Sequence, residues 1–267
     1  MKGDLHMHSY YSDGFYAPAA VMRKAYDAGC EIVALTDHDT IDGVAEARAA
    51  AAQLGMRYVT GVELSSFAGT EVHILGYGVP CDNARFGAFI AEQKERRRVR
   101  ADRLLRNLAA RGMVLSYEQM RAPLRGEVSR THIAAELVRA GYERDFHEAI
   151  RKWLHKGSPT FVPVEGVSPE TVIEEIHAAG GAAVLAHPVR LDMEPTERTA
   201  FIRRLAAAGL DGIEAKYKRS SRATVKAFCA LADALGLFVT AGADYHGDRN
   251  EIIARPLSAQ CVGQLTD

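Results

Sequence analysis

Six of the ten histidines lie in short clusters with acidic residues, and these residue types together could bind metal ions. Each cluster comes at the end of a run of residues with strand character. Imidazole nitrogen and carboxylate oxygen in combination suit Zn, Mn or Fe, rather than Ca or Mg alone. The clusters are Asp4-Leu-His6-Met-His8, Ser12-Asp13-Gly14, Thr36-Asp37-His38-Asp39, Gly61-Val-Glu63, His73-Ile-Leu, Ala186-His187-Pro188 and Asp244-Tyr-His246.

The positions of these clusters predict that they meet at one edge of a barrel. In a parallel α/β barrel, functional side chains gather at the C-terminal ends of the strands. His6 and His8 are two residues apart, so on a strand both side chains point to the same face. The clusters contain more candidates than the roughly six ligands that one ion takes, so they indicate two or three divalent ions.

Several of these residues also have a simpler interpretation. His187 precedes Pro188, and the proline by itself could end the strand at this position. Asp39 is expected to lie in a solvated turn that caps the following helix. Asp37 is expected to orient a ligand, for example by accepting a hydrogen bond from an imidazole N–H. Asp4 fits either interpretation and is left out of the predicted ligand set.

Short β-branched runs alternate with helical patterns, which is typical of parallel strands joined by crossover helices. The number of such runs favours a closed or nearly closed α/β barrel over an open sheet. The strands are expected at residues 4–8, 31–36, 57–62, 71–77, 182–186, 212–216 and 238–242. The barrel helices are expected at residues 18–28, 41–54, 169–179, 195–208 and 221–235.

A long interruption with helical patterns only separates the fourth and fifth expected strands. Its helices are expected at residues 83–111, 130–140 and 144–155. This segment is too long for an ordinary barrel connection. The sequence therefore predicts an inserted, all-helical subdomain at residues 82–165 that caps the substrate site. Residues 1–81 and 166–267 are expected to form the barrel domain.

Composition narrows the class of protein further. The 267 residues suffice for one large barrel domain, and the apolar content of 48% is typical of a globular chain. The chain has 33 Lys and Arg against 34 Asp and Glu, which argues against an extensive nucleic-acid surface but permits a local basic patch. Four dispersed cysteines, with no apolar run of ~18 residues, predict a reduced, cytoplasmic protein without a membrane span.

The ordered motifs H-x-H-S, S-D-G, T-D-H-D, G-V-E, H-I-L-G, A-H-P and D-x-H resemble those of the PHP family, named for polymerase and histidinol phosphatase. They extend from Asp4 to His246 and cover nearly the whole chain. The resemblance implies a distorted seven-stranded barrel with a trinuclear site, usually of Mn, Fe or Zn, in which Glu63 bridges two ions. The ligands that it implies are His6, His8, Asp13, His38, Glu63, His73, His187, Asp244 and His246.

Helical geometry separates the arginines of the first inserted helix. At about 100° per residue, Arg97 falls in one stripe with apolar residues, and Arg100 lies about 60° from its centre. An arginine in such a stripe is costly unless it meets an anion. We therefore expect Arg97 and Arg100 to face the barrel mouth and bind a substrate phosphate. An internal salt bridge to an Asp or Glu of the barrel is the alternative. The apolar members of the stripe are Phe86, Ile90, Ala101, Leu104 and Leu108.

The start of the next inserted helix is a second candidate for phosphate binding. Ser129 is expected to cap this helix, and free N–H groups at a helix N-terminus attract anions. The family resemblance supports substrate contacts by the same segment. The predicted contact residues are Arg130, Thr131 and His132.

Together these features predict metal-dependent hydrolysis of a phosphomonoester by metal-bound hydroxide, with Mn as the expected metal and Fe or Zn as alternatives. No catalytic side chain is assigned beyond the ligands. The insertion resembles that of stand-alone family members that include nucleoside 3′,5′-bisphosphate phosphatases and 5′-to-3′ exoribonucleases on short RNA. The first expectation is therefore release of the 3′-phosphate from a nucleoside 3′,5′-bisphosphate, which gives a 5′-mononucleotide.

Other functions remain open from the sequence. Within the same chemistry, the chain could act on the 5′ end of short RNA or on histidinol phosphate. A C–N hydrolase of the amidohydrolase type also uses an H-x-H motif, but Asp13 and the spacing of Asp244 and His246 speak against it. A metal-binding scaffold of a polymerase is the third class, and the chain contains no polymerase region.

Overall fold

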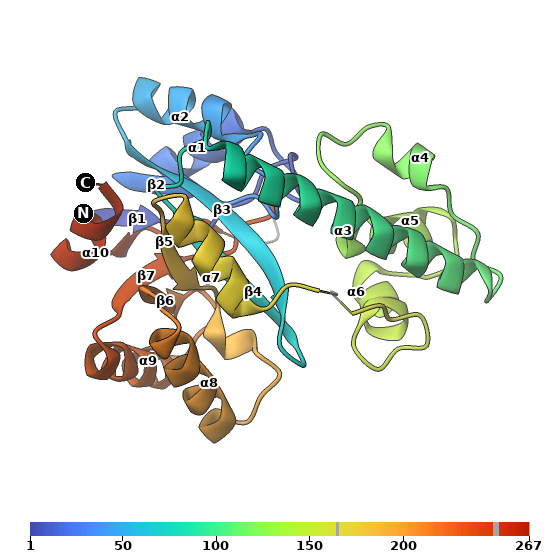
Figure 1. Cartoon of the computed structure of the whole chain (residues 1–267). Helices are drawn as coiled ribbons and strands as arrows, with labels where there is room; N and C mark the ends of the chain where they lie inside the picture. Colours follow the sequence, from blue (N-terminus) through green and yellow to red (C-terminus); the bar gives the residue numbers. More distant parts are fainter. Residues whose placement is uncertain (164–165, 248–250, 267) are drawn as a thin grey trace.

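Strands from both ends of the chain form one nearly closed, mixed α/β barrel (Figure 1). The computed structural model describes residues 1–163, 166–247 and 251–266. The strand order in the sheet is β7-β6-β5-β4-β3-β2-β1-β8. The strands are β1 (Lys2–Asp4), β2 (Ile32–Leu35), β3 (Arg57–Phe67), β4 (Glu71–Tyr77), β5 (Ala182–Leu185), β6 (Gly212–Tyr217), β7 (Phe238–Gly242) and β8 (Arg255–Pro256).

The barrel closes where the segment after β1 meets the segment that contains β7. The Leu5 N–H donates to the Ala241 carbonyl at 3.0 Å, and Met7 forms a parallel bridge with Tyr245. The first strand was expected to continue to His8, but its regular pairing with β2 ends at Asp4. This closure brings the H-x-H motif beside the D-x-H motif, although more than 200 residues separate them in the sequence.

The expectation of parallel strands is correct on both sides of β4 and wrong for β4 itself. β1, β2 and β3 pair in parallel, as do β5, β6 and β7, whereas β4 is antiparallel to β3 and to β5. β3 is longer than expected and continues to Phe67, so a tight turn leads directly into β4. His73 therefore lies near the beginning of its strand, opposite Ser65, at the barrel edge where the parallel strands end.

The barrel helices lie close to their expected positions. They are α1 (Pro18–Asp27), α2 (Val44–Gln53), α7 (Pro169–Ala178), α8 (Pro195–Ala207) and α9 (Arg222–Leu235). The main difference is α2, which begins at residue 44 rather than 41 and has no side-chain cap. Beyond Pro256, where the sequence carried no structural signal, the chain forms α10 (Ala259–Thr266).

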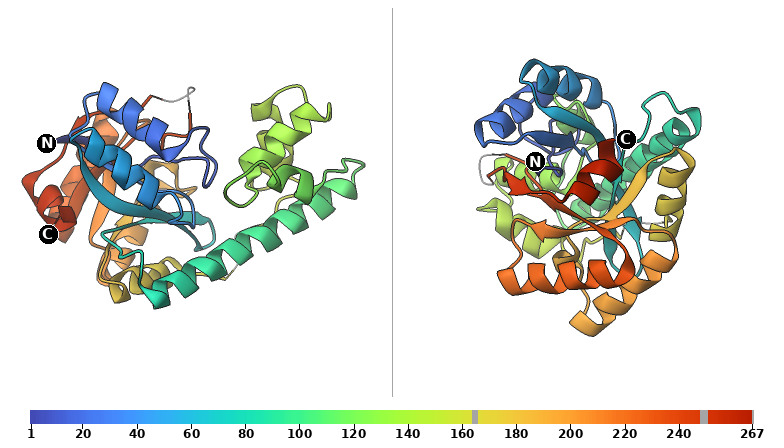
Figure 2. Two further views of the ribbon diagram at one scale, coloured as in Figure 1. Left: turned by 90° about the horizontal axis from the view of Figure 1, so that it is seen from above. Right: turned by 90° about the vertical axis from the view of Figure 1, so that its left-hand side faces the viewer.

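Between β4 and α7 the regular elements of the described chain are all helices, and we call these helices with their connections the helical cap. They are α3 (Ala84–Ala109), α4 (Tyr117–Arg121), α5 (Arg130–Arg139), α6 (Phe146–Ala149) and a π-helical turn, η1 (Ile150–Leu154). Figure 2 shows α3 as a long rod that leads from the barrel to the other cap helices. The expected end of the insertion, Glu165, lies outside the described residues.

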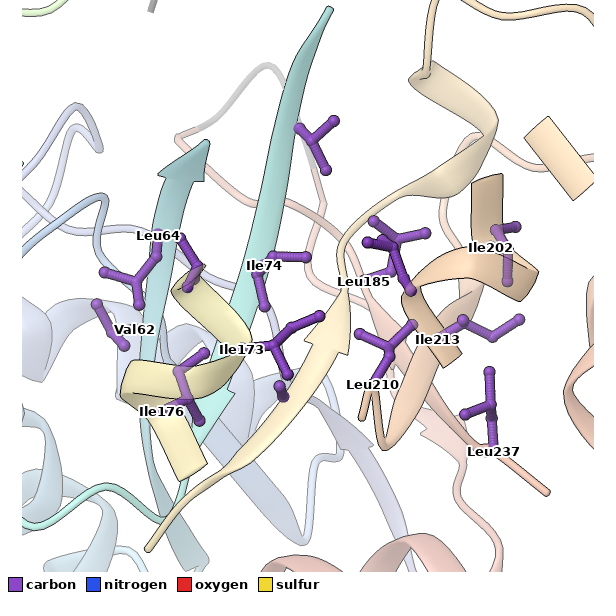
Figure 3. Close-up of a cluster of buried hydrophobic side chains, with 14 of the residues drawn as sticks. Val62, Leu64, Ile74, Ile173, Ile176, Leu185, Ile202, Leu210, Ile213 and Leu237 are labelled. Atoms are coloured by element: carbon purple, nitrogen blue, oxygen red, sulfur yellow. The ribbon is translucent and has the colours of Figure 1, made fainter. Parts of the chain in front are cut away.

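The apolar stripe of α3 packs into two separate cores. Phe86 and Ile90 belong to the core of the barrel, whereas Leu104 and Leu108 pack against α5 in a core of the cap. The barrel core fills the space between the sheet and α7, where Val62 and Ile74 face Ile173 and Ile176 (Figure 3). One helix thus fixes the cap relative to the edge of the barrel.

Removing the buried side chain of Ile176 should destabilise the barrel strongly. Ile176 is fully buried, so Ile176→Ala should lower the free energy of unfolding by about 2–5 kcal/mol through lost burial and a cavity. Urea denaturation followed by circular dichroism measures this change. Val114→Ala is the control, because Val114 is 70% exposed and its truncation should change stability by less than about 0.5 kcal/mol.

Candidate metal centre

The carboxylate of Glu63 lies at the centre of the site and is fully buried. Its Oε2 atom is 3.1–3.2 Å from three imidazole nitrogens, and its Oε1 atom is 2.9 Å from two more. Glu63 is in β3, so side chains from β4 and from the segments after β1, β2 and β5 converge on this one strand. The five histidines around it are His6, His8, His38, His73 and His187.

The remaining predicted ligands extend this group toward the cap. Asp13 Oδ1 lies 3.0 Å from His246 Nε2, and Asp244 Oδ1 lies 3.3 Å from His8 Nε2. All nine predicted ligands therefore meet in one place, which we call the nine-residue site. Eight of them form three overlapping sets whose ligand atoms lie within 4.8 Å of one another: His8, Asp13, His38 and His246; His6, His8, Glu63 and Asp244; and His38, Glu63 and His73. The ninth, His187, contacts Glu63.

Buried polar atoms in this site fit a set of divalent cations. In the described part of the chain, several ring nitrogens and carboxylate oxygens are inaccessible to solvent and make no hydrogen bond. Leaving such atoms without a partner costs about 1–3 kcal/mol each, whereas coordination would satisfy them. Nitrogen and oxygen donors together suit Mn, Fe or Zn. These atoms are His6 Nε2, both ring nitrogens of His8, Asp13 Oδ1, His38 Nδ1, Glu63 Oε2 and His187 Nδ1.

Carboxylates and imidazoles of the site shift one another's pKa values. Burial would raise the pKa of Glu63, but His38, His6 and His73 outweigh it and hold this pKa well below its usual range. Burial would lower the pKa of His73, but Glu63 raises it to about 9. Burial would lower the pKa of His246 as well, but Asp13 and Asp244 raise this pKa to about 10. The raised pKa values of His73 and His246 thus favour the protonated imidazoles beside these carboxylates, whereas burial lowers the pKa values of His38 and His187.

Backbone strain is concentrated at the same site. Asp39, His187 and Asp244 are the non-glycine residues with positive φ in the described chain, at 52°, 25° and 53°. Such angles cost about 1–3 kcal/mol each and persist where surrounding contacts enforce them. Two of these residues are predicted ligands, and the third directly follows His38. The barrel therefore holds its metal-facing loops in conformations that a free chain avoids.

Sequence reasoning missed Glu214, which orients two of the predicted ligands. Its Oε1 atom is 3.0 Å from His6 Nδ1, and its Oε2 atom accepts the His187 N–H at 2.8 Å. A Cβ atom at Gly242 would lie 2.1 Å from the same carboxylate, so only glycine leaves room for it. The available signal was a carboxylate in the middle of an expected strand, where buried charges are rare.

The expectations for Asp37 and Asp39 are both wrong in detail. Asp37 accepts hydrogen bonds from the Ser9 N–H and from the hydroxyls of Ser9 and Ser12, rather than from an imidazole. It therefore shapes the loop that carries Asp13. Asp39 is buried rather than solvated, and it accepts the Ser65 N–H at 2.8 Å instead of capping a helix.

The two arginines of the α3 stripe face the barrel, where each meets a carboxylate. Arg97 forms an ion pair with Asp39 and donates to the Ser65 hydroxyl at 2.9 Å. Arg100 donates to the Val162 carbonyl at 2.9 Å and forms a longer ion pair, at 3.3 Å, with Glu71. The alternative of an internal salt bridge is therefore realised for both arginines. Binding of a substrate phosphate by the same two arginines stays a prediction.

The N-terminus of α5 lies next to the nine-residue site and contacts it through Thr131. Ser129 caps the helix as expected, and the His132 ring completes a capping box with it. The Thr131 hydroxyl donates to Asp13 Oδ2 at 3.3 Å. Arg130 pairs with Glu71 at 2.8 Å. A cavity between barrel and cap is lined by Asp13, His38, His73, Arg97, Arg100, Arg130 and Thr131, and His132 is not among its lining residues.

The close approach of cap and barrel depends on one glycine. A Cβ atom at Gly126 would lie 1.9 Å from the Tyr11 carbonyl oxygen, which is too close for any other residue without movement. The segment that precedes α5 therefore packs directly on the loop that carries Asp13. This contact, together with the Thr131–Asp13 hydrogen bond, places the cap over the site.

Comparison with known proteins agrees with this geometry. The PHP domain family matches residues 4–155, which is more than half of the chain. The chain is 38% identical over 246 residues to the 3′,5′-nucleoside bisphosphate phosphatase of Chromobacterium violaceum, covering 91% of this chain and 86% of that protein. It is 35% identical over 246 residues to a 5′-3′ exoribonuclease of Haemophilus influenzae, covering 92% and 90% of the two chains.

Two solved structures share the fold. A Chromobacterium violaceum protein described as an amidohydrolase, solved with sulfate and no metal, has a TM-score of 0.87 and 34% identity over 97% of this chain and 93% of that one. A Bifidobacterium adolescentis protein, assigned as a metal-dependent phosphoesterase, has a TM-score of 0.86 and 26% identity. The match covers 98% of this chain and 94% of that one.

The chain therefore belongs to the PHP family. It is a metal-dependent phosphoric ester hydrolase, and the expected PHP-type barrel is confirmed. Among the described residues, no helix combines the length and apolar character needed to cross a bilayer.

Glu63→Gln should weaken metal binding, because the substitution removes the buried charge that five imidazoles surround. We expect the affinity for Mn²⁺ to fall about tenfold or more, since even residues that merely support ligands change affinity by this amount. Elemental analysis after gel filtration measures the bound metal. Glu118→Gln, an exposed position on α4, is the control and should retain the wild-type content. Full metal content in Glu63→Gln would contradict a central role for this carboxylate.

Metal binding should also release protons and strengthen as pH rises. His73 and His246, with pKa values of about 9 and 10, are protonated at pH 7 and must lose these protons before they can coordinate a cation. Calorimetric titration of chelator-treated protein with Mn²⁺ in two buffers of different ionisation enthalpy measures the protons released. Identical heats in both buffers would show that these imidazoles are neutral or do not bind metal.

Proposed function

We propose that this enzyme removes the 3′-phosphate of nucleoside 3′,5′-bisphosphates and leaves a 5′-mononucleotide. The observation that carries this proposal is a pair of arginines joined to the nine-residue site through one carboxylate. Glu71 contacts Arg100, Arg130 and the ring of His73, which is one of the nine residues and contacts Glu63 with its other nitrogen. Two positively charged side chains thus lie one carboxylate beyond His73, and both line the cavity beside the site.

The substrate has two phosphates, and this arrangement offers a separate place for each. In a nucleoside 3′,5′-bisphosphate the two phosphates are attached to different carbons of one ribose. With the 3′-phosphate at the nine-residue site, the 5′-phosphate reaches Arg100 and Arg130, whose planar guanidinium groups suit bidentate binding of phosphate. The Chromobacterium violaceum relative, named for this activity, supports the same substrate class.

We assign the nine-residue site as the holder of three divalent ions, with Mn expected. The three overlapping sets each offer one position, and Glu63 belongs to two of them, which suits a bridging carboxylate. Bound cations would polarise a phosphoryl oxygen and make hydroxide available near neutral pH. Glu214 holds His6 and His187 in orientation, and Thr131 holds Asp13.

We assign the cap arginines and the start of α5 to substrate positioning. Arg100 and Arg130 bind the phosphate that does not react, which fixes the ester for in-line attack. Arg97, held by Asp39 and Ser65, faces the same cavity and adds positive charge beside His38. Thr131 lines the cavity beside Asp13, and His132 holds the same helix end in place through its capping box with Ser129. The insertion at residues 82–165 would then serve as a substrate-capping subdomain.

A second candidate is 5′-to-3′ hydrolysis of short RNA, the activity for which the Haemophilus influenzae relative is named. A smaller cavity next to His38 is lined by Lys94, Arg121 and Arg125 of the cap, together with Tyr11. Its basic and aromatic side chains suit the backbone and base of a further nucleotide. All four cysteines of the chain are unpaired, which supports a reducing, cytoplasmic location for either substrate.

A substrate panel tests the proposed function directly. The metal-loaded enzyme should release phosphate from nucleoside 3′,5′-bisphosphates with a higher kcat/KM than from histidinol phosphate. A 5′-phosphorylated short RNA tests the second candidate, and a dihydropyrimidine tests the amidohydrolase alternative. No phosphate release from any ester by protein with confirmed metal would refute the proposal.

Arg130→Ala should raise KM for the bisphosphate about tenfold or more, because a charge-assisted contact to phosphate is worth ~1.5–3 kcal/mol. Bound metal should remain unchanged, because the ion pair of Arg130 is with Glu71, which is not one of the nine residues. Arg98→Ala is the matched control, since Arg98 pairs with Glu95 and Asp102 on the exposed side of α3. An unchanged KM in Arg130→Ala would remove this residue from the phosphate contact.

A further inference from the structure

Glu71 connects three elements at the boundary between cap and barrel. It is the first residue of β4, and its Oε2 atom pairs with Arg130 Nη2 of α5 at 2.8 Å. Its Oε1 atom lies 3.3 Å from Arg100 Nη1 of α3 and 3.4 Å from His73 Nε2. All four side chains are more than half buried and line the cavity beside the nine-residue site.

The charges of this group are unequal. Arg97 meets Asp39 one to one, whereas the single carboxylate of Glu71 faces two guanidinium groups. In addition, Arg100 Nη2 is buried and has no hydrogen-bond partner among the described residues. A buried, unpaired donor is costly, so this nitrogen indicates a place for a further anionic oxygen. A phosphate offers more oxygens than a carboxylate and carries more negative charge.

We propose that Glu71 is a specificity-determining residue that occupies, in the substrate-free enzyme, the position where Arg100 and Arg130 bind the substrate's non-reacting phosphate. This inference rests on the proposed function. A carboxylate and a phosphate both bind guanidinium groups through two oxygens, so one can replace the other. The phosphate gains the Arg100 Nη2 contact that Glu71 leaves unmade. Exchange is therefore favourable for a substrate with a second phosphate.

The same exchange discriminates against other esters. A substrate without a second phosphate offers nothing to displace Glu71, so the carboxylate stays between the arginines. It then narrows the cavity and repels negative charge near the site. After exchange, Glu71 still has His73 Nε2 beside it, and a carboxylate in this position fixes the orientation of an imidazole. Specificity thus arises from an internal competitor as well as from attraction.

A purely structural role for Glu71 makes the opposite prediction. If this carboxylate only ties the cap to the barrel, its neutralisation should loosen the cap and weaken binding of all substrates equally. If it competes for the phosphate position, neutralisation should strengthen binding, and only for substrates with a second phosphate. The direction of the change in KM therefore separates the two roles.

The test compares Glu71→Gln with the wild-type holoenzyme on a nucleoside 3′,5′-bisphosphate and on the corresponding nucleoside 3′-monophosphate. We expect KM for the bisphosphate to fall about fivefold, as removal of one competing charged partner predicts. KM for the monophosphate should stay within about twofold, and bound metal should be unchanged, because glutamine can still accept from His73. Glu136→Gln is the matched control, since Glu136 is similarly buried and pairs with Arg139 away from the cavity.

An unchanged or higher KM for the bisphosphate in Glu71→Gln would overturn the inference, as would an equal change for both substrates. Should Glu71→Gln lose metal or fail to fold, Glu71→Asp withdraws the carboxylate by one methylene group and should lower the same KM. Failure of the proposed function has a different signature, because the wild type would then not hydrolyse the bisphosphate. In that case the affinity for inorganic phosphate, measured by calorimetry, still tests whether Glu71 competes for the phosphate position. Glu71→Gln should bind inorganic phosphate more tightly than the wild type.

Discussion

The buried carboxylate of Glu63 is the constraint on which the rest of the structure depends. An ionised carboxylate without solvent is unstable unless positive charge or a cation compensates it. Here five imidazoles, from β-strand ends and loops across the barrel, lie within 3.2 Å of its two oxygens. They reach it because the sheet curves from β1 to β5 around β3. Closure between the segments after β1 and β7 then brings Asp244 to His8, so the curvature of the barrel and the assembly of the site depend on each other.

Ion pairs between arginines of the cap and carboxylates of the barrel attach the cap beside the nine-residue site. Asp39 follows His38 and binds Arg97, while Glu71 precedes His73 by two residues and binds Arg100 and Arg130. Each link joins a cap arginine to a carboxylate beside a predicted ligand. The interface between cap and barrel is thus also the wall of the cavity, and any anion that enters competes with pairs that hold the wall together.

The sequence indicated the predicted ligands because each donor lies in a short motif of distinctive residue types. It did not reveal their partners, because those pairings are long-range: His6 meets Glu214 across 208 residues, and Arg97 meets Asp39 across 58. The antiparallel β4 was missed although its signal was present. Fewer than ten residues separated the expected third and fourth strands, and a parallel crossover needs about a dozen or more. Length alone excluded the helix that parallel pairing requires.

The wrong expectation for Asp39 shows why local patterns fail at such sites. An aspartate just before a helix normally caps it, since its carboxylate accepts hydrogen bonds from the exposed N–H groups of the first turn. In this protein Asp39 has a φ of 52° and turns inward, where Ser65 and Arg97 bind it. The ion pair with Arg97 of the cap helps to hold Asp39 in this strained backbone conformation. The residues around Asp39 in the sequence give no sign of a partner so far along the chain. Because His38 directly precedes this strained residue, the position of a predicted metal ligand depends on an arginine of the cap. The Arg97 contact, together with the hydrogen bond from the Ser65 N–H, therefore holds the backbone beside His38, and the cap takes part in the geometry of the candidate metal centre.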